Sequence, residues 1–590
     1  MAAQRAYTTH PLVLRRVTVR GVHQVTPRMR RVVLGGEELA AFTRDGIGHP
    51  AFAAPGFDDH VKLILAADGD VRAALPAQLP HGIEWTPAEH RLTRDYTPRR
   101  VDTQAGELHL DFVVHGDGPA EAWAAAAREG DELWFVGPKS SLRLPERLDW
   151  IQLVGDETAL PAIGRFLDER PLDAPAHLLV TVSDESARQE LALREGDTVT
   201  WVVAEPGDAA ALETAVRALP VEAGEGYVWA AAESRALLPV RRYLQRERKL
   251  PKDRLNVTGY WHREEAPAPE AETTADAAVR EPARIPSPLP WLAARAALRL
   301  GVVDAVADAP GLSAEALATR LGVSGPGIGV LLPLLSSYGV VVGADDGTPG
   351  LRLGPAGEEL LDEHEREEYT GHEAELLLAL THLAPALRGG GSPWRLASGG
   401  TLHEAVAQDA ERYGELVEEC EQLVFLLGGL TADPLWESVG TCLLTGPGSA
   451  SVAAALDDAG RRPRLRVAED AVPVTVLRGH VPAPDRIGWT AGPADVAVAA
   501  KALAHRTDEE AALLLTRLAG WTRTAVLVEA SRPDGLSPHA AEAALHAYAA
   551  TGSPLRDSAA VAALAHRSGW EVERAIALGW GTEATVLRRA

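Results

Sequence analysis

An arginine, a tyrosine and a threonine lie close together in residues 94–99, which have the sequence Arg-Asp-Tyr-Thr-Pro-Arg. The guanidinium of Arg94 can hold a phosphate through two parallel hydrogen bonds. The ring of Tyr96 can lie against a flat cofactor, and the hydroxyl or amide of Thr97 can reach the redox edge of a flavin. Taken alone, an aromatic residue beside an arginine more often reflects strand packing with a surface charge, so the flavin interpretation depends on the residues C-terminal to this stretch.

A glycine turn and an alanine-rich helix come next. The strand that contains Asp111 ends in the turn at 115–118, and the helix is predicted over 120–128 with Pro119 at a first-turn position. A helix start presents free N–H groups and the positive end of a dipole, which suit a pyrophosphate. A strand with a small-residue turn then lies at 130–141, and a further strand at 150–154 leads into a turn and a helix.

Six motifs in order resemble those of the siderophore-interacting proteins, which are FAD-dependent ferric-siderophore reductases of the ferredoxin-reductase-like superfamily. The motifs are Phe-Asp-Asp-His-Val-Lys-Leu at 57–63, Arg-Asp-Tyr-Thr at 94–97, His-Gly-Asp-Gly-Pro at 115–119 with Trp123, Gly-Pro-Lys-Ser at 137–140, Gly-Asp-Glu-Thr-Ala-Leu-Pro at 155–161 and Gly-Tyr-Trp at 259–261. The resemblance covers residues 10–263. One departure is that the family commonly ends Tyr-Trp-Arg-Arg-Gly, whereas residues 260–264 are Tyr-Trp-His-Arg-Glu.

The resemblance implies a set of site residues. Arg94 is expected at the flavin phosphate, Tyr96 at the ring and Thr97 at the redox edge. The pyrophosphate region is implied at His115, Gly118, Pro119 and Ala120, and further cofactor contacts at Asp111, Val113, Thr158 and Trp261. A basic mouth that draws in an anionic ferric siderophore is implied at Lys62, Lys139 and Arg263. The alternative for each lysine is a solvated surface charge, and no metal-ligand set is predicted.

Composition limits the protein class. The chain has 590 residues, 46% hydrophobic content and a formal net charge of -25, and about four domains are expected at this length. A strongly acidic surface repels a phosphate polyanion, so nucleic acid is not expected as a partner. Without an apolar signal region or a run of roughly 18 apolar residues, a cytoplasmic protein with no membrane contact is expected. Cys420 and Cys442 are predicted to be small buried side chains.

The order of elements predicts a multidomain protein. Residues 10–148 alternate short β-like runs, among them 29–35 and 132–136, with turns, which indicates an antiparallel β-barrel that binds FAD. Residues 149–263 change to strand-helix-strand order, with helices predicted over 160–169 and 235–249, which is typical of a parallel α/β domain. A dinucleotide G-x-G-x-x-G is absent, so NAD(P)H as electron donor is implied by the resemblance, with ferredoxin as the alternative. Residues 264–286, rich in acid, proline and alanine, are predicted to be a disordered linker between tethered modules.

The remaining residues resemble small-molecule O-methyltransferases. Residues 287–365 predict short helices, one of them with Ser313 as its N-cap, and a hairpin with a turn at 345–347. They are similar to the winged-helix dimerisation region of that family, and the candidate recognition helix 326–337 carries no basic residue. Residues 366–590 are expected to form an α/β methyltransferase-like Rossmann domain in degenerate form. Gly446 and Gly448 occupy the place of the S-adenosylmethionine loop and His505 that of the catalytic base, although a lone histidine is more often structural. Poor or absent S-adenosylmethionine binding is predicted.

These patterns predict an FAD-dependent reductase of ferric siderophores that releases Fe(II) in the cytoplasm. Two alternatives stay open. One is a general NAD(P)H:flavin reductase, and the other is a bifunctional protein whose C-terminal half is an active methyltransferase. A homodimer formed through the winged-helix region is also expected, because pairing of apolar faces needs no cofactor.

Overall fold

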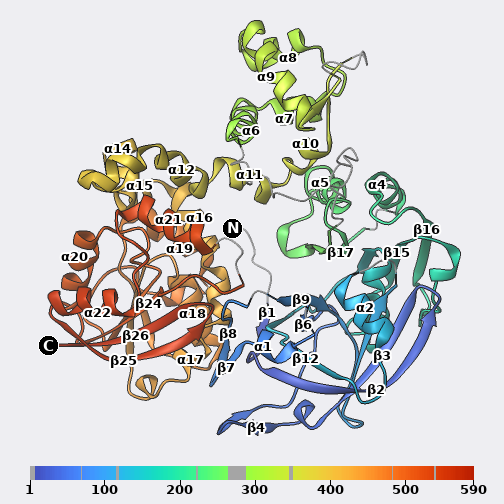
Figure 1. The fold of residues 1–590 in the computed structure, drawn as a ribbon, viewed down its shortest axis with the longest axis horizontal. Coiled ribbons are helices and arrows are strands. Elements are labelled where there is room, and N and C mark those ends of the chain that lie inside the picture. The colour runs from blue at the N-terminus through green and yellow to red at the C-terminus, as the bar shows by residue number, and fades with distance from the viewer. Residues whose placement is uncertain are drawn as a thin grey trace, which may run out of the picture.

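The computed structural model describes residues 7–67, 69–88, 90–114, 118–220, 223–262, 287–343, 350–481, 483–536 and 540–590. The predicted linker lies outside this set. Figure 1 shows a barrel, a parallel α/β domain, a helical region and a second α/β domain in succession along the chain. Among the described helices none alone is long and apolar enough to cross a membrane, although α8 (Ala314–Leu321) and α9 (Gly325–Ser337) pass that test as a pair bent by 117°.

The N-terminal elements are mostly antiparallel strands. They are β1 (Tyr7–Thr9), β2 (Leu14–Thr26), β3 (Met29–Gly35), β4 (Phe42–Arg44), β5 (Ile47–His49), β6 (Val61–Ala66), α1 (Val71–Ala74), β7 (Ala77–Leu79), β8 (Gly82–Glu84), β9 (Arg91–Tyr96), β10 (Pro98–Asp102), β11 (Glu107–Val113), α2 (Pro119–Ala126), β12 (Glu132–Val136) and β13 (Ser140–Leu142). Seven of them form one sheet in the order β10-β11-β3-β2-β12-β6-β9. Its inner face is apolar, with Val32, Leu63 and Phe112 fully buried.

The two edges of this sheet meet at a single residue. β9 and β10 stand at opposite ends of the strand order, yet only Thr97 separates Tyr96 from Pro98 in the chain. The sheet therefore curls until its edges adjoin, which closes it into a barrel with a seam at Thr97. The predicted antiparallel barrel is confirmed.

The second group forms a parallel sheet covered by helices. Its elements are β14 (Trp150–Gly155), α3 (Leu160–Glu169), β15 (Ala176–Val182), β16 (Thr198–Val203), α4 (Ala209–Ala218), β17 (Gly226–Glu233), α5 (Leu237–Arg242), the π-helical turn η4 (Tyr243–Glu247) and β18 (Leu255–Trp261). The strand order is β16-β15-β14-β17-β18, and β14 and β17 are buried along their whole length, as expected between two helical layers. This confirms the predicted parallel α/β domain.

Helix α3 joins the two domains. Arg165 on this helix is buried and donates from Nη1 to the carbonyl oxygen of Pro98 at 3.1 Å. Arg99 in β10 forms an ion pair with Asp168 on the same helix at 2.7 Å. Both contacts lie next to Thr97, so the parallel domain is attached to the barrel at its seam.

The helical region contains α6 (Leu289–Leu300), α7 (Val302–Asp308), α8, α9, β19 (Val341–Val342), β20 (Arg352–Leu353) and α10 (Pro355–Glu359). The side chain of Ser313 accepts a hydrogen bond from the amide of Ala316, which confirms it as the N-cap of α8. β19 and β20 pair antiparallel, as the predicted hairpin requires. The turn predicted at 345–347 lies outside the described residues.

The last group is a second α/β domain. Its first, helical part contains α11 (Glu363–Thr370), α12 (His372–Ala379), α13 (Leu383–Pro385), α14 (Pro393–Ser398), α15 (Leu402–Gln408), α16 (Ala410–Glu419), the 3-10 helix η8 (Glu421–Phe425) and α17 (Gly428–Thr431). The sheet and its helices are β21 (Thr441–Thr445), α18 (Ser449–Asp458), β22 (Arg464–Val467), α19 (Ala471–His480), β23 (Val496–Ala500), α20 (Asp508–Leu518), β24 (Thr524–Ala530), α21 (Ala540–Thr551), α22 (Ser558–Arg567), β25 (Trp570–Gly579) and β26 (Thr582–Arg589). The order is β22-β21-β23-β24-β26-β25, and β26 runs antiparallel to β24.

The barrel and this last domain pack against each other, which the prediction of tethered modules did not include. Figure 1 shows β7 and β8 beside β25. Leu536 and Trp580 pack on the barrel cluster that contains Ile83 and Trp85. The fit is tight, because a Cβ added at Gly535 would lie 1.9 Å from the carbonyl oxygen of Trp85.

An ion pair between the buried Glu84 and the half-exposed Arg532 crosses this interface. Arg532 donates to the Glu84 carboxylate at 2.7 Å, and the amide of Gly581 donates to the other oxygen at 3.3 Å. Burial raises the pKa of Glu84, and Arg532 opposes this rise. The helical region contacts the parallel α/β domain, because Glu358 on α10 forms an ion pair with Arg242 on α5 at 2.8 Å.

We expect Arg532→Ala to lower stability by about 1–3 kcal/mol at pH 8, because it leaves a buried carboxylate without its cation. Loss of Arg532 raises the pKa of Glu84 further, so the folded state holds that proton more tightly than the unfolded state. The penalty relative to the wild type is therefore small at pH 4, where Glu84 is largely protonated in both folded proteins, and it grows as pH rises through the folded-state pKa of Glu84. Thermal unfolding at both pH values measures it.

Two controls accompany this variant. Arg532→Lys keeps a cation beside Glu84 and should lower stability less than Arg532→Ala. Arg462→Ala removes an exposed arginine of the same domain and shows the effect of losing a surface charge alone. An equal loss at pH 4 and pH 8 would contradict the role of the Glu84 charge.

Candidate functional site

The predicted clamp residues lie at the barrel seam. Arg94 and Tyr96 are in β9, and Thr97 is the buried residue between the two edge strands. Tyr260, at the end of β18, shares a side-chain hydrogen bond with Thr97. Burial first, and then the nearby Asp58, raise the pKa of Tyr260, so its hydroxyl stays neutral. The seam is thereby tied to the last strand of the parallel sheet.

A row of aromatic rings connects the seam to helix α2. The ring centroid of Tyr96 lies 4.4 Å from that of Phe112, and Phe112 lies 5.8 Å from Trp123 on α2. Gly118 is the N-cap of α2 and has no side chain, so no N-cap side chain accepts a hydrogen bond from the first-turn amides. Burial, assisted by Glu121, raises the pKa of Tyr96. The structure thus brings Tyr96 and the predicted pyrophosphate helix together.

Three predicted residues act through packing or internal pairing. The carboxylate of Asp111 accepts two hydrogen bonds from Arg31, at 2.6 and 2.8 Å, so its side chain is already engaged. Val113 and Ala120 are buried in the hydrophobic core. These side chains hold β11 and α2 in place. His115 and Arg263, which were predicted to bind the pyrophosphate and the substrate, lie outside the described residues.

Asp156 brings Thr158 and Trp261 together. The Trp261 Nε1–H donates to Asp156 Oδ2 at 2.7 Å, and the amide of Thr158 donates to Oδ1 at 2.8 Å. Burial raises the pKa of Asp156, and these hydrogen bonds oppose the rise. No role was predicted for Asp156, although its place directly after the buried strand β14 was a usable signal.

Two neighbouring carboxylates have different partners: Asp58 ties the barrel to the parallel sheet, and Asp59 is bonded within the barrel domain. Asp58 Oδ2 accepts a hydrogen bond from Trp229 Nε1 at 3.0 Å. Asp59 Oδ2 accepts from the amide of Gly56 at 2.8 Å and from the hydroxyl of Ser141 at 2.7 Å. Burial raises the pKa of Asp59 to about 7, while the two hydrogen bonds lower it. These residues belong to a recognised motif, but no local pattern assigned them a role.

The two predicted lysines have different partners. Lys62 pairs with Asp95 across β6 and β9, with Nζ–O distances of 2.8 and 3.0 Å. Lys139 Nζ donates to Gln422 Oε1 at 2.9 Å and lies 5.0 Å from the centroid of the Phe425 ring. Gln422 and Phe425 belong to η8 in the C-terminal domain. Because 283 residues separate Lys139 from Gln422 in the sequence, no local sequence pattern could predict this contact.

The predicted S-adenosylmethionine loop is bonded to the protein itself. Glu469 Oε1 accepts hydrogen bonds from Thr445 Oγ1 and from the amide of Gly446, both at 2.6 Å. The amide of Gly448 donates to the carbonyl oxygen of Ala500 at 3.1 Å. A Cβ at Gly446 would lie 2.4 Å from that same oxygen. The amides of Gly446 and Gly448 and one oxygen of the Glu469 carboxylate are therefore engaged in internal contacts.

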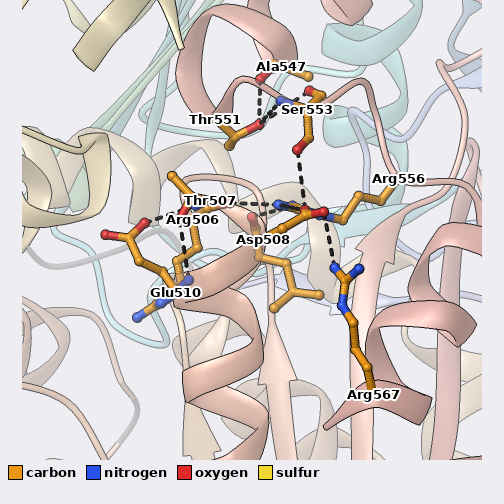
Figure 2. Close-up of polar contacts among 10 residues, drawn as sticks. Arg506, Thr507, Asp508, Glu510, Ala547, Thr551, Ser553, Arg556 and Arg567 are labelled. Carbon is orange, nitrogen blue, oxygen red and sulfur yellow. Dashed lines mark hydrogen bonds and ion pairs between the residues drawn. The ribbon is translucent and has the colours of Figure 1, made fainter. Parts of the chain in front are cut away.

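His505 is buried, and its side chain is hydrogen-bonded to Arg506. Arg506 Nη1 lies 2.9 Å from His505 Nε2, and because a guanidinium only donates, this nitrogen must accept. Burial and Arg506 hold the pKa of His505 far below its usual range. Figure 2 shows Arg556 beside Asp508. Arg556 also donates a hydrogen bond to the carbonyl oxygen of Arg506 at 2.7 Å. The loop that contains His505 is thus fixed by arginine contacts.

A cavity of about 330 Å³ lies beside this loop. Its polar lining includes His372, Glu419, Lys501, His505, Glu529 and His546, and Pro447 of the glycine loop also borders it. Burial raises the pKa of Glu419 and that of Glu529 to about 7. Cys420 also lines the cavity and, like Cys442, is buried as predicted. Among the described residues no group of three or more His, Cys, Asp or Glu side chains could hold a metal ion.

The barrel, the parallel sheet and the residues gathered at the seam define a two-domain flavin-dependent reductase. Residues 18–142 match the model of the siderophore-interacting FAD-binding domain, and residues 148–264 match that of the siderophore-interacting protein. The NADPH-dependent ferric-chelate reductase of Escherichia coli strain K12 is 31% identical over 254 residues, which cover 42% of this chain and 94% of that protein. The chain therefore belongs to the siderophore-interacting protein family.

Two solved structures are also similar. A siderophore utilization protein from T. fusca is 37% identical. The alignment covers 45% of this chain and 98% of that protein, with a TM-score of 0.41. The mitomycin 7-O-methyltransferase MmcR is 22% identical, with coverage of 51% of this chain and 94% of its own and a TM-score of 0.38.

We expect the full chain to bind S-adenosylmethionine weakly or not at all, because the amides of Gly446 and Gly448 and the carboxylate of Glu469 already have partners. Isothermal titration calorimetry measures this directly. A dissociation constant in the micromolar range would contradict the prediction, and a parallel titration with FAD on the flavin-free protein shows that the sample is folded.

Proposed function

We propose that the chain is an FAD-dependent reductase of ferric siderophores that takes its electrons from NAD(P)H. The observation that carries this proposal is the meeting of Tyr96, Thr97 and Tyr260 at the barrel seam, in a chain of the siderophore-interacting protein family. The relative from Escherichia coli is named as an NADPH-dependent ferric-chelate reductase, which favours NADPH as the donor.

The donor set at the seam fits an anionic flavin nucleotide. Arg94 is exposed, and its Nη1 donates to the neighbouring carbonyl oxygen of Thr93 at 2.9 Å, which leaves other guanidinium N–H groups for a phosphate. The start of α2 adds amides without a side-chain cap. Arg94, Thr97 and the first turn of α2 would hold FAD, and Tyr96 would support its ring.

The proposed reaction balances over two chelates. FAD held by these residues would supply the chemistry that converts one hydride from NAD(P)H into two single-electron transfers. One NAD(P)H and two ferric chelates thereby give NAD(P)⁺, one proton and two ferrous chelates. The lower charge of Fe(II) weakens its attraction to anionic oxygen ligands, so reduction favours release of the metal.

The chain's own residues bind and orient the reactants. Lys62 and Lys139 provide positive charge in a chain of net charge -25, and their field acts over a Debye length of roughly 8 Å at physiological salt. Tyr96 and Tyr260 stay neutral, because burial raises the pKa of each. We place the reaction in the cytoplasm, where NAD(P)H is supplied.

We also propose that the C-terminal half is a docking or dimerisation platform. The helical region exposes large apolar side chains at Leu289, Leu292, Leu300, Val330 and Tyr338. Such a face can pair across a two-fold axis. The engaged His505 and the bonded glycine loop support a role without methyl transfer.

We predict that FAD copurifies without a covalent bond and that Arg94→Ala weakens its binding roughly ten- to a hundredfold, because a charge-assisted contact worth about 1.5–3 kcal/mol is lost. Fluorescence titration of flavin-free protein gives the dissociation constant. Arg100→Ala, an exposed arginine in β10 paired with Asp102, is the matched control. If wild-type protein folds but does not bind FAD, the proposed function fails.

We predict that Lys139→Ala and Lys62→Ala raise the KM for anionic ferric chelates while FAD content stays unchanged. Asp95→Asn should have the opposite effect, because it frees the charge of Lys62. Added salt should reduce all of these differences through screening. Steady-state reduction with a ferrous-ion indicator measures KM, and an unchanged KM in the double lysine variant would refute the basic mouth.

A further inference from the structure

The C-terminal domain reaches the predicted substrate mouth of the reductase. Gln422 and Phe425, both on η8, contact Lys139 through a hydrogen bond of 2.9 Å and through a ring centroid at 5.0 Å. Gln422 is exposed and Phe425 is half-buried, so both side chains border solvent beside the lysine. Residues from the two halves therefore share one surface around the Lys139 ammonium group.

The chemistry of this surface is a positive charge beside an aromatic ring. Lys62 forms an ion pair with Asp95, whereas the groups in direct contact with Lys139 are a neutral amide oxygen and a ring face. Burial lowers the pKa of Lys139, and the longer-range attraction of Asp95 opposes this shift. A cation over a ring is held by the ring's electron density. The ring also offers a flat apolar contact to a molecule that approaches the lysine.

The element that carries these side chains is fixed on both sides. Leu423 of η8 belongs to the core of the C-terminal domain, and the carbonyl oxygen of Cys420, directly before η8, accepts a hydrogen bond from Ser451 at 2.7 Å. Gly428, shortly after η8, lies against the backbone of His81, because a Cβ there would be 3.4 Å from its oxygen. The position of Phe425 relative to the barrel is thus set by packing.

We propose that Gln422 and Phe425 form one wall of the ferric-chelate site and favour chelates whose iron ligands are aryl oxygens, as in catecholates and phenolates. This inference rests on the proposed function. An aryl-oxygen chelate brings both negative charge for Lys139 and an aromatic ring for Phe425. An aliphatic chelate, such as a citrate complex, satisfies only the lysine.

Binding of gallium chelates tests this wall without any redox step, since Ga(III) carries the charge of Fe(III) and is not reduced. The full chain is titrated with Ga(III) catecholate and with Ga(III) citrate. Phe425→Ala should weaken the catecholate complex roughly three- to tenfold, the size of one aromatic contact. It should change the citrate complex less than about twofold, because citrate has no ring to stack. Phe425→Leu keeps the bulk without the ring and should resemble Phe425→Ala.

Gln422→Ala should weaken both complexes modestly, because the amide positions the lysine that both chelates use. Leu513→Ala, an exposed residue of α20 in the same domain, is the matched control and should change neither. FAD content and NADPH-driven reduction of a small uncharged quinone should be unaltered in every variant, which shows that the reductase remains intact.

The outcomes are distinguishable. If wild-type protein binds both chelates and Phe425→Ala binds them equally well, the wall is absent while the proposed function stands. If Phe425→Ala binds both chelates more tightly, η8 covers the site instead of contributing to it, which also overturns the inference. If wild-type protein binds and reduces no ferric chelate but still reduces the quinone, the proposed function fails and the inference fails with it.

Discussion

The meeting of the two barrel edges at Thr97 sets the geometry of the reductase half. Because β9 and β10 close the barrel through one residue, the side chains of Arg94 and Tyr96 are brought to the place where the parallel sheet arrives. Arg165 and Arg99 fasten α3 to the same corner, and Tyr260 bonds to Thr97 from β18. A change in how the barrel closes would therefore displace the proposed flavin contacts and the domain interface together.

Local patterns were sufficient to predict much of the fold. Alternating strands and turns predicted β3 and β12 with their observed bounds, and the apolar run from Leu160 predicted α3. The helix predicted over 235–249 is shorter, since α5 ends at Arg242 and continues as the π-helical turn η4. Short-range patterns report which residues form an element, but a terminal turn depends on the contacts that surround it.

The partners of the site residues could not be predicted in this way. Asp111 is held by Arg31, 80 residues away, and Lys139 by Gln422, 283 residues away. Such pairs arise only when the barrel closes and the two halves pack, so no spacing within a motif records them. The motifs predict which residues form the site, whereas the chemistry available to each side chain, such as the occupied carboxylate of Asp111, depends on tertiary structure.

The joining of both halves in one chain has a consequence for the contact at Lys139. The hydrogen bond and the cation–ring contact at Lys139 are each worth only about 1 kcal/mol at a solvent-exposed position, so they would not by themselves hold two separate proteins together. Within a single chain the same groups meet at an effective concentration of the order of millimolar or more. The packing of Leu536 and Trp580 on the barrel holds the two halves in place. Covalent fusion and this packing together keep the weak contact at Lys139 in place, and each copy of the reductase half has its own Phe425 at a fixed one-to-one ratio.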